Sequence, residues 1–445
     1  MSTSQKGADP AAPRVARWTP WRVVVMLGVT SLAADMVYEG ARSIYGPLLA
    51  SLGATAVVVG VVTGAGEAIA LVLRLVSGPL TDRTGRYWAV TIVGYGLTAV
   101  SVPLLAFTPF LGAAGLAVAA ALILLERTGK AIRSPAKSAL LADAATQVGT
   151  GRGFGVHKAL DQTGAFLGPL LVAAVVGFTG MLWVGPAALA VPGVVAMIVL
   201  FATRAHTPEP AHAREATTAS SPEDPATASS AAPATRASSL PGQGWIARAL
   251  GAGLPRAFFW YAAAAGLMTG GLVTFGLIGY HLVVAGLASD AAVPVIYAFG
   301  MLAEALAALA IGWSYDRIGP RVLFAVPVLV AIVPAVAMSG TLTVAVAGVL
   351  VWGFAFGLQD STIKALVADI VEAPRRATAY GVFAAVQGVM AIGGGLMAGW
   401  LYDVSVTWLA IVVACTQAVA AVVLAIAFRT MRGSRDDAPH GAIPA

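Results

Sequence analysis

Long apolar runs recur along almost the whole chain, and no other feature limits its possible folds as strongly. A helix needs about 20 mostly apolar residues to cross the hydrocarbon core of a bilayer. We expect twelve such helices, at residues 21–50, 55–79, 88–108, 112–136, 152–178, 181–203, 254–286, 292–314, 321–339, 342–368, 376–402 and 405–428. The sequence therefore predicts an all-α membrane protein with twelve transmembrane helices.

The composition excludes a water-soluble fold. Of the 445 residues, 58% are hydrophobic and only 11% are charged, whereas soluble proteins carry about 25% charged residues. Such a chain cannot cover its own surface in water. Disordered, collagen-like and nucleic-acid-binding classes are excluded as well, and the lipid bilayer is the expected surrounding.

Basic residues gather in alternate loops. The segments after the second, fourth, sixth, eighth and tenth predicted helices hold Lys and Arg, as do both tails, and the loops at the opposite end hold none. By the positive-inside rule, both termini are expected in the cytoplasm and the protein in the cell inner membrane. Topology therefore explains the net charge of +6 without a nucleic acid partner.

One polar segment divides the chain into two halves. Residues 204–250 are rich in Ala, Ser, Thr, Pro and Glu, and they hold too few large apolar side chains to fold by themselves. We expect a mostly disordered cytoplasmic linker there, between six-helix bundles at 18–203 and 251–429. Residues 1–17 and 430–445 are expected to be cytoplasmic tails.

The two halves repeat two sequence patterns. Residues 78–86 (GPLTDRTGR) resemble residues 312–321 (GWSYDRIGPR), and their Asp-Arg pairs are 234 positions apart. Residues 138–143 (SALLAD) recur at 364–369 (KALVAD), 226 positions later. Each half has an even number of predicted helices, so both halves run the same way through the membrane. We expect an axis along the membrane normal to relate them.

These patterns resemble the major facilitator superfamily of secondary transporters. Its loop signature Gly-x-Leu-x-Asp-Arg-x-Gly-Arg matches residues 78–86, and the resemblance extends over about 18–429. It implies two pseudo-symmetric bundles that carry a small-molecule substrate by alternating access, in a monomer without cofactors. The sequence has no Gly-rich phosphate loop followed by Lys-Ser or Lys-Thr, so we expect no enzyme that hydrolyses ATP.

The resemblance also implies a gate at the cytoplasmic surface. It pairs Arg86 with Asp143, and it places Asp82 opposite the positive end of the eleventh helix. Exposed ion pairs contribute only about 0–1 kcal/mol each, which suits contacts that open in every cycle. The expected gate residues are Gly78, Asp82, Arg83, Arg86, Asp143, Asp316, Arg317, Arg321 and Asp369. The alternative is that these charges only set the topology.

The fifth predicted helix resembles the antiporter motif of the superfamily. The matching residues are Gly155, Gly164, Gly168 and Pro169, although Val-Ala stands at 172–173 where the full motif has a glycine pair. The match implies exchange of the substrate against another solute. The alternative is ordinary close packing, because small residues let helix backbones approach each other.

Ionisable residues inside the predicted spans mark the transport site, because a charge there costs about 2.5 kcal/mol or more. Asp35, Glu39 and Arg42 are spaced i, i+4, i+7 and share a helix face. At about 1.5 Å per residue, Asp35 lies near the midplane. Asp35, Glu39, Glu67 and Asp161 are the expected proton-coupling residues. The competing interpretation is a permanent Glu39–Arg42 bridge that only holds the helix.

Other residues at similar depth are expected to line the substrate cavity. They are Tyr38, Arg42, Arg127, Phe166, Tyr280, Glu304 and Trp352, and the aromatic members would equally suit a core position. Arg127 is a candidate partner of Asp161 across the cavity. No metal site is expected, because His157 is alone on its helix and Cys415 is the only cysteine.

Three functions remain open from the sequence. The first is a proton-coupled antiporter that exports a small amphipathic molecule. The second is uptake or facilitated transport of a small organic anion, with Arg42 and Arg127 as contacts. The third is a membrane receptor or scaffold that does not transport.

Overall fold

The computed structural model describes residues 18–210, 253–372 and 375–436. Within these ranges, the side chains at 312–313, 315–316, 361–365, 368–369, 377 and 432–436 are outside the description. The predicted tail at 1–17, most of the predicted linker and the end of the chain from 437 also lie outside it.

The part of the chain that is described folds into helices and contains no β-strand. The N-terminal half consists of α1 (Pro20–Arg42), α2 (Tyr45–Ser51), α3 (Ala56–Thr84), α4 (Tyr87–Leu104), η1 (Leu105–Ala114), α5 (Gly115–Thr146), α6 (Thr150–Thr179), α7 (Val184–Ala188) and α8 (Ala190–His206). The C-terminal half consists of α11 (Arg256–Gly271), α12 (Phe275–Val284), α13 (Ala292–Ile318), η2 (Gly319–Phe324), α14 (Ala325–Ala337), α15 (Leu342–Ile370), α16 (Arg376–Val404) and α17 (Val406–Asp436).

The predicted membrane spans are confirmed. Eleven segments of the described residues are long and apolar enough to cross a bilayer. One of them, Tyr87–Thr146, contains both α4 and α5, which explains why twelve predicted spans correspond to eleven segments. The predicted ends differ in detail, since α5 continues through Pro135 to Thr146 and α8 extends to His206.

Three predicted spans are discontinuous. The first divides into α1 and α2 at residues 43–44, the sixth into α7 and α8 at 189, and the seventh into α11 and α12 at 272–274. Gly270 and Gly271 precede the last break, and glycine is among the residues that disfavour helix most. Residues 272–274 line a cavity between the halves. Non-helical backbone at membrane depth is tolerated at such a place.

The repeated loop pattern produces the same turn in both halves. Gly85 ends α3 with φ +62°, and Gly319 follows α13 with φ +65°. Glycine adopts this left-handed conformation without the steric cost that a Cβ would bring. The glycine of each Asp-Arg-x-Gly segment therefore ends its helix abruptly, which gives the repeated pattern the same structural role in both halves.

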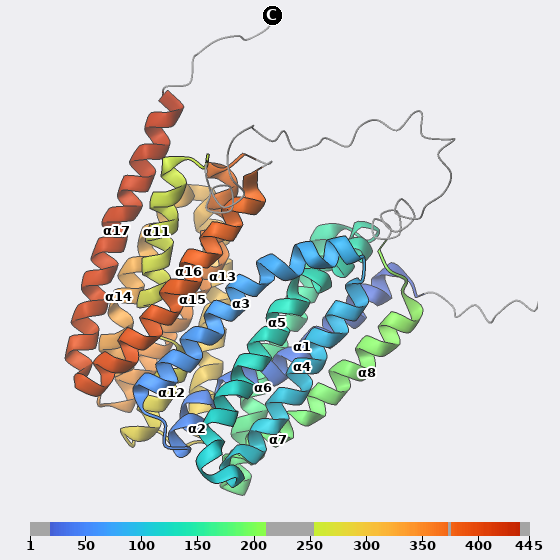
Figure 1. The fold of residues 1–445 in the computed structure, drawn as a ribbon, viewed down its shortest axis with the longest axis vertical. Coiled ribbons are helices and arrows are strands. Elements are labelled where there is room, and N and C mark those ends of the chain that lie inside the picture. Colours follow the sequence, from blue (N-terminus) through green and yellow to red (C-terminus); the bar gives the residue numbers. More distant parts are fainter. Residues whose placement is uncertain (1–17, 211–252, 373–374, 437–445) are drawn as a thin grey trace, which may run out of the picture.

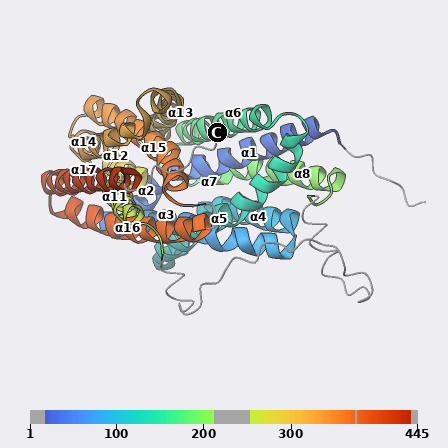
Figure 2. The same ribbon diagram turned by 90° about the horizontal axis from the view of Figure 1, so that it is seen from above.

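Figure 1 shows the two halves as two bundles, coloured blue to green and yellow to red, and Figure 2 shows them side by side from above. At one end, helices of the two bundles are in close contact. The backbones of α3 and α16 meet at Gly60 and Gly395, where a Cβ on either residue would collide with the other's carbonyl group. Thr63 and Thr274 share a hydrogen bond of 2.7 Å across the same interface. We call this the closed end.

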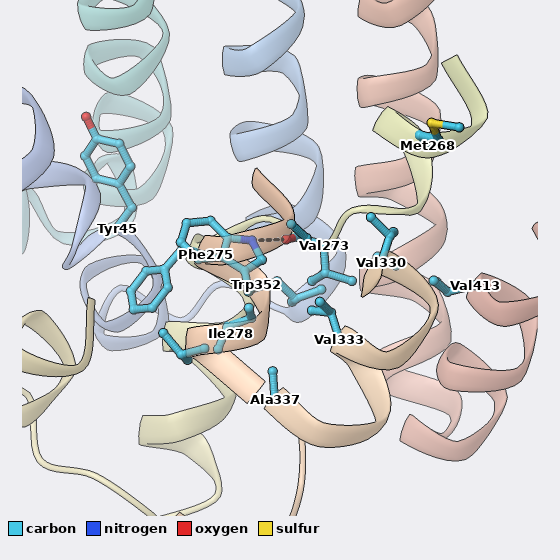
Figure 3. Close-up of a cluster of buried hydrophobic side chains, with 14 of the residues drawn as sticks. Tyr45, Met268, Val273, Phe275, Ile278, Val330, Val333, Ala337, Trp352 and Val413 are labelled. Carbon is cyan, nitrogen blue, oxygen red and sulfur yellow. Dashed lines mark hydrogen bonds between the residues drawn. The ribbon is translucent and has the colours of Figure 1, made fainter. Parts of the chain in front are cut away.

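The buried apolar residues follow the same division. One cluster joins both halves near the closed end and includes Tyr45, Phe275 and Trp352. Figure 3 shows part of it, with the Trp352 indole N–H donating to the Val273 carbonyl at 2.9 Å. The second cluster contains residues of the N-terminal half only. The halves are therefore packed as one unit at the closed end.

Candidate functional site

A cavity of about 360 Å³ lies between the two halves. It is lined by α1, α3, α5 and α6 on one wall and by α11, α12, α13, α15 and α16 on the other. The side chain of Lys158 lines it and is 62% exposed, so the cavity opens at the end opposite the closed end. We call that the open end.

The charges in this cavity are distributed unevenly. All of the basic side chains that line it belong to the N-terminal half; they are Arg42, Arg74, Arg127, Lys130, Arg133, Lys137 and Lys158. That wall also carries Asp35, Glu39, Glu67 and Asp161. The described lining residues of the C-terminal half carry only acidic charges, Glu304 and Asp360.

Arg42 is the centre of a buried ion network. Its guanidinium lies 2.7 Å from the Glu67 carboxylate on α3 and 3.8 Å from Glu39 on its own helix. Glu39 is also 3.7 Å from the Lys130 ammonium on α5. The predicted Glu39–Arg42 bridge is thus present, but the shorter contact of Arg42 joins α1 to α3. Spacing along one helix did not indicate this partner.

Arg127 extends the network along α5. It lies 3.5 Å from Glu67 and 3.6 Å from Glu126, and it donates a hydrogen bond to the Tyr38 hydroxyl. Tyr45 donates to Glu126 at 3.3 Å, which leaves the other Glu126 oxygen buried without a partner. The expected pairing of Arg127 with Asp161 is not formed. Helix rotation instead directs Arg127 toward α3.

One hydrogen bond connects the network to the other half. Tyr297 on α13 donates its hydroxyl proton to the Glu39 carboxylate, and both side chains are buried. Tyr297 packs against Phe275 and Trp352 at ring-centroid distances of 4.4 and 6.1 Å. The charge network of the N-terminal half is therefore attached to the aromatic core at the closed end.

A second cluster lies nearer the open end. Asp35 on α1 and Asp161 on α6 both line the cavity, and their two helices pack closely at Gly164 and Gly168. Lys137 and Lys158 lie 3.7 and 3.4 Å from Asp161. Lys137 also donates to Ser31 at 3.0 Å. Asp35 has no ion-pair partner among the described residues. Neighbouring carboxyl groups repel each other when both are ionised, so Asp35 is the group of this cluster at which a proton can bind.

The wall of the C-terminal half presents hydrogen-bond acceptors. Glu304 on α13 has no hydrogen-bond or ion-pair partner among the described residues. The side-chain amides of Gln359 and Gln387 both donate to the Thr269 hydroxyl, at 2.9 and 3.0 Å. Because its amide is used in this way, the Gln359 oxygen is left buried without a donor.

Most of the predicted cavity residues line the cavity, and two do not. Tyr38, Arg42, Arg127, Glu304 and Trp352 are in its wall, together with all four expected proton-coupling residues. Phe166 is partly buried outside the cavity wall. Tyr280 is buried at the closed end, where it makes an edge contact with Tyr402 at 5.9 Å. Both side chains face neighbouring helices rather than the cavity, which periodicity alone could not distinguish.

The Arg86–Asp143 pair that was predicted for the gate is not formed in this conformation. Arg83 and Arg86 are exposed, and Arg86 forms no ion pair with Asp143 within 4.0 Å. Asp82 accepts a hydrogen bond of 2.8 Å from Tyr87 at the start of α4. Gly78 faces Pro135, and Arg317 and Arg321 lie at the corresponding turn of the other half. The side chains of Asp316 and Asp369 lie outside the description.

The glycines of the helix-5 motif have different surroundings. Gly164 and Gly168 on α6 press against the α1 backbone at Leu32 and Met36, and Pro169 is buried beside them. Gly155 has open space where a Cβ would be. Part of the motif therefore serves the α1–α6 contact that brings Asp35 and Asp161 together.

Sequence reasoning missed several cavity residues. Arg74 is seven positions after Glu67 in α3. Its charge at membrane depth could have identified it as a cavity residue. Lys158 is three positions before Asp161, which could have identified it in the same way. Tyr297 and Gln359 carry no charge, so the rule that charges at membrane depth mark the site did not single them out.

Known proteins agree with this architecture. The sequence profile of the Major Facilitator Superfamily matches residues 27–359 and 284–444 of the chain. The chain is 47% identical over 422 residues to an uncharacterized protein of Mycobacterium tuberculosis. That match covers 94% of this chain and 96% of the relative.

Two solved structures have a similar fold. A mutant form of the nucleoside transporter NupG has a TM-score of 0.70 at 15% identity, over 91% of this chain and 100% of that one. A bacterial homolog of the human lysosomal transporter Spinster has a TM-score of 0.65 at 16% identity, over 95% of this chain and 99% of that one. The chain therefore belongs to the Major Facilitator Superfamily, and it is a multi-pass membrane transporter rather than an enzyme.

Proposed function

We propose that the protein is a proton-coupled antiporter that exports a small amphipathic molecule by alternating access. The observation that carries the proposal is the placement of Asp35 and Asp161 in one cavity wall, on two closely packed helices. A proton on one of two neighbouring carboxyl groups relieves their repulsion, and its loss restores that repulsion. The pair can thus respond to the proton concentration on the side to which the cavity opens.

Lys137 and Lys158 provide a way to transmit this change. Both lie within 4 Å of Asp161. The two ammonium groups keep Asp161 ionised, so the proton is held by Asp35, and its loss places a second negative charge beside Asp161 and changes the field at the cavity mouth. A substrate and a proton then compete for one set of charges, as antiport requires.

The closed end supports the proposed conformational cycle. The basic loops lie at the open end, which the positive-inside rule assigns to the cytoplasm. On this assignment the structure represents an inward-facing state of an inner-membrane protein with cytoplasmic termini. In the opposite state we propose that the gate residues pair and that the contacts of α3 with α16 separate. The absence of an Arg86–Asp143 pair within 4.0 Å in this state supports that order of events.

Uptake of a small organic anion is the second candidate. The excess of basic side chains on the N-terminal wall favours it. Arg42 and Arg127 are already held by carboxylates in the wall, so this function would need one of these pairs to exchange for the substrate. We therefore prefer the antiporter.

Proton coupling is tested in everted membrane vesicles with a fluorescent ΔpH probe and rhodamine 110 as a small fluorescent amphipathic compound. Wild-type protein should accumulate rhodamine 110 and release part of the proton gradient. Asp35→Asn and Asp161→Asn should each reduce both signals at least tenfold, whereas Asp290→Asn, outside the cavity lining, should not. Accumulation that persists in either cavity variant, or after an ionophore collapses the gradient, would refute the coupling. Gradient-independent uptake of fluorescein instead would support the organic anion function.

A further inference from the structure

We infer that the cargo is a zwitterion, whose anionic group binds the N-terminal wall of the cavity and whose cationic group binds the C-terminal wall. The inference rests on the proposed function, because it names the cargo of the same cavity. It follows from the polar groups that the protein leaves unpaired on the two opposing walls.

The N-terminal wall has a basic side chain without a partner among the described residues, which is Arg74. Three of the wall's four carboxylates are ion-paired, since Glu39 and Glu67 pair with Arg42 and Asp161 with Lys137, and the fourth, Asp35, is the proposed proton site. Arg74 on α3 has no hydrogen-bond or ion-pair partner for its side chain among the described residues, and its Nε is buried.

The position of Arg74 is defined by its own helix. The neighbouring Ser77 donates to the Ala131 carbonyl of α5 at 3.2 Å, which fixes α3 against α5 at this level. Arg74 therefore lies on the wall that carries Lys130 and Ser134, and all three line the cavity. A guanidinium with several free N–H donors is suited to a carboxylate or a similar planar anion.

The C-terminal wall has unpaired hydrogen-bond acceptors. Glu304 is an unpaired carboxylate, and the Gln359 oxygen is buried without a donor. Both side chains line the same cavity, and their helices α13 and α15 cross where Gly357 packs against the Glu304 carbonyl. An ammonium group has three donors and no acceptor, so one such group can satisfy a carboxylate and an amide oxygen together.

A cargo with a single charge would leave one wall unsatisfied. An anion would pair Arg74 but leave Glu304 and the Gln359 oxygen without donors after water is excluded. A cation would pair Glu304 and the Gln359 oxygen but leave Arg74 without an acceptor. Buried polar groups that lose water without gaining a partner oppose binding. Only a molecule with separate anionic and cationic groups satisfies both walls.

Aromatic rings lie between the two walls and suit an apolar body. Trp352 and Phe356 are stacked with centroids 5.6 Å apart, and the Arg42 guanidinium is 5.1 Å from the Phe356 ring. Tyr38 lines the same cavity from α1. A cavity of about 360 Å³ matches a small ligand. The expected cargo is thus a small zwitterion with an aromatic or aliphatic group.

Four compounds on one scaffold separate the charges. Phenylalanine is a zwitterion at pH 7, N-acetylphenylalanine an anion, phenylalanine amide a cation, and N-acetylphenylalanine amide is neutral. The measurement is the thermal unfolding midpoint of the purified full-length protein in detergent as each compound is titrated. Phenylalanine should stabilise the protein at a concentration at least tenfold lower than either singly charged compound. The neutral compound should give no shift.

Two variants assign the two walls. With Glu304→Gln, phenylalanine should lose its advantage over N-acetylphenylalanine and keep its advantage over the amide. With Arg74→Gln, phenylalanine should lose its advantage over phenylalanine amide and keep its advantage over N-acetylphenylalanine. Arg256→Gln, an exposed residue at the start of α11, is the control and should bind all four compounds as the wild type does.

The inference is overturned if either singly charged compound stabilises the wild type as well as phenylalanine does, or if no compound in the series shifts the midpoint. Neither result depends on a proton gradient. If charge selection fails while Asp35→Asn and Asp161→Asn still abolish coupling, the inference falls and the proposed function stands. If charge selection holds while those variants remain coupled, the proposed coupling falls instead.

Discussion

Single side chains in the cavity wall are held by more than one partner. Glu67 is within 4 Å of both Arg42 and Arg127, which come from different helices. Its side chain is 26% exposed, whereas those of the two arginines are 7% and 3% exposed. The carboxylate therefore keeps two buried guanidinium groups close together, and its charge is the main reason that they tolerate each other.

Glu67→Gln should destabilise the protein, because it removes the carboxylate that Arg42 and Arg127 share and leaves each with one other carboxylate, Glu39 at 3.8 Å and Glu126 at 3.6 Å. Loss of one partner from a buried pair costs about 3–5 kcal/mol, and the partial exposure of Glu67 places the expected loss at the lower end. The measurement is the thermal midpoint in detergent. The double variant Arg42→Gln/Glu67→Gln should recover part of the loss. If the double variant is less stable than Glu67→Gln, the proposed repulsion is wrong.

Glycine residues set the distance between neighbouring helices, as the contact between α6 and α1 shows. α6 approaches α1 so closely that a Cβ on Gly164 would meet the Leu32 carbonyl, whereas Gly155 on the same helix faces open space. Both glycines belong to the motif that the sequence singled out. Their unlike surroundings separate a packing role from a role in the helix end.

Gly164→Ala should push α6 away from α1, because backbone atoms cannot move aside as the end of a side chain can. We expect a stability loss of about 1–3 kcal/mol, typical of overpacking, and a larger distance between Asp35 and Asp161. Gly155→Ala is the matched control and should be neutral or slightly stabilising. Equal effects of the two substitutions on the thermal midpoint would contradict the assigned packing.

The segment after α8 is attached to the start of α4. The Glu209 carboxylate accepts from the Trp88 backbone N–H at 3.4 Å, and the Trp88 indole N–H donates to the Pro208 carbonyl at 3.2 Å. Burial raises the pKa of the Glu209 carboxyl above its ordinary value, although the backbone hydrogen bonds act in the opposite direction. This carboxyl is only partly buried, so its effect on stability is small.

A raised pKa in the folded state gives a stability contribution that is complete below the pKa of the unfolded chain and is lost as the pH rises. The thermal midpoint of the wild type, taken relative to Glu209→Gln, should therefore fall between about pH 4, near the ordinary Glu pKa, and neutral pH. A difference that grows with pH would show that the hydrogen bonds to the carboxylate outweigh its burial.

The whole molecule is two bundles joined at one end. Apolar packing, the glycine contacts of α3 with α16 and the Thr63–Thr274 hydrogen bond all lie there. The open end has the charged loops, and Arg86 and Asp143 form no ion pair within 4.0 Å there. Alternating access therefore requires this joined end to separate.

Cysteines at positions 63 and 274 should lock the closed end when oxidised. The two hydroxyl oxygens are 2.7 Å apart, so sulfur atoms at these positions lie near bonding distance. The pair is introduced in a Cys415→Ser background to exclude other thiols. Oxidation should stop rhodamine 110 transport in vesicles and reduction should restore it, while each single cysteine variant stays active under both conditions. Unchanged transport by a fully cross-linked protein would show that this end does not open.

The sequence by itself determined the membrane spans, the division into two repeated halves and most of the acidic residues of the cavity. Charges and long apolar runs are visible locally, because a bilayer penalises each ionisable residue and requires about 20 apolar residues for each crossing. The repeated turn at Gly85 and Gly319 likewise follows from the local sequence pattern.

Only the tertiary structure decided which of these residues meet. Tyr297 reaches Glu39 across 258 positions of sequence, and Arg127 turns to Glu67 instead of Asp161. Phe166 and Tyr280 share the chemistry of cavity residues but face elsewhere. Pairing depends on the rotation and crossing of helices that are distant in sequence, and a one-dimensional pattern does not contain those angles. The unpaired groups on the two walls, Arg74 and Glu304, emerge only after every other partner has been assigned in space.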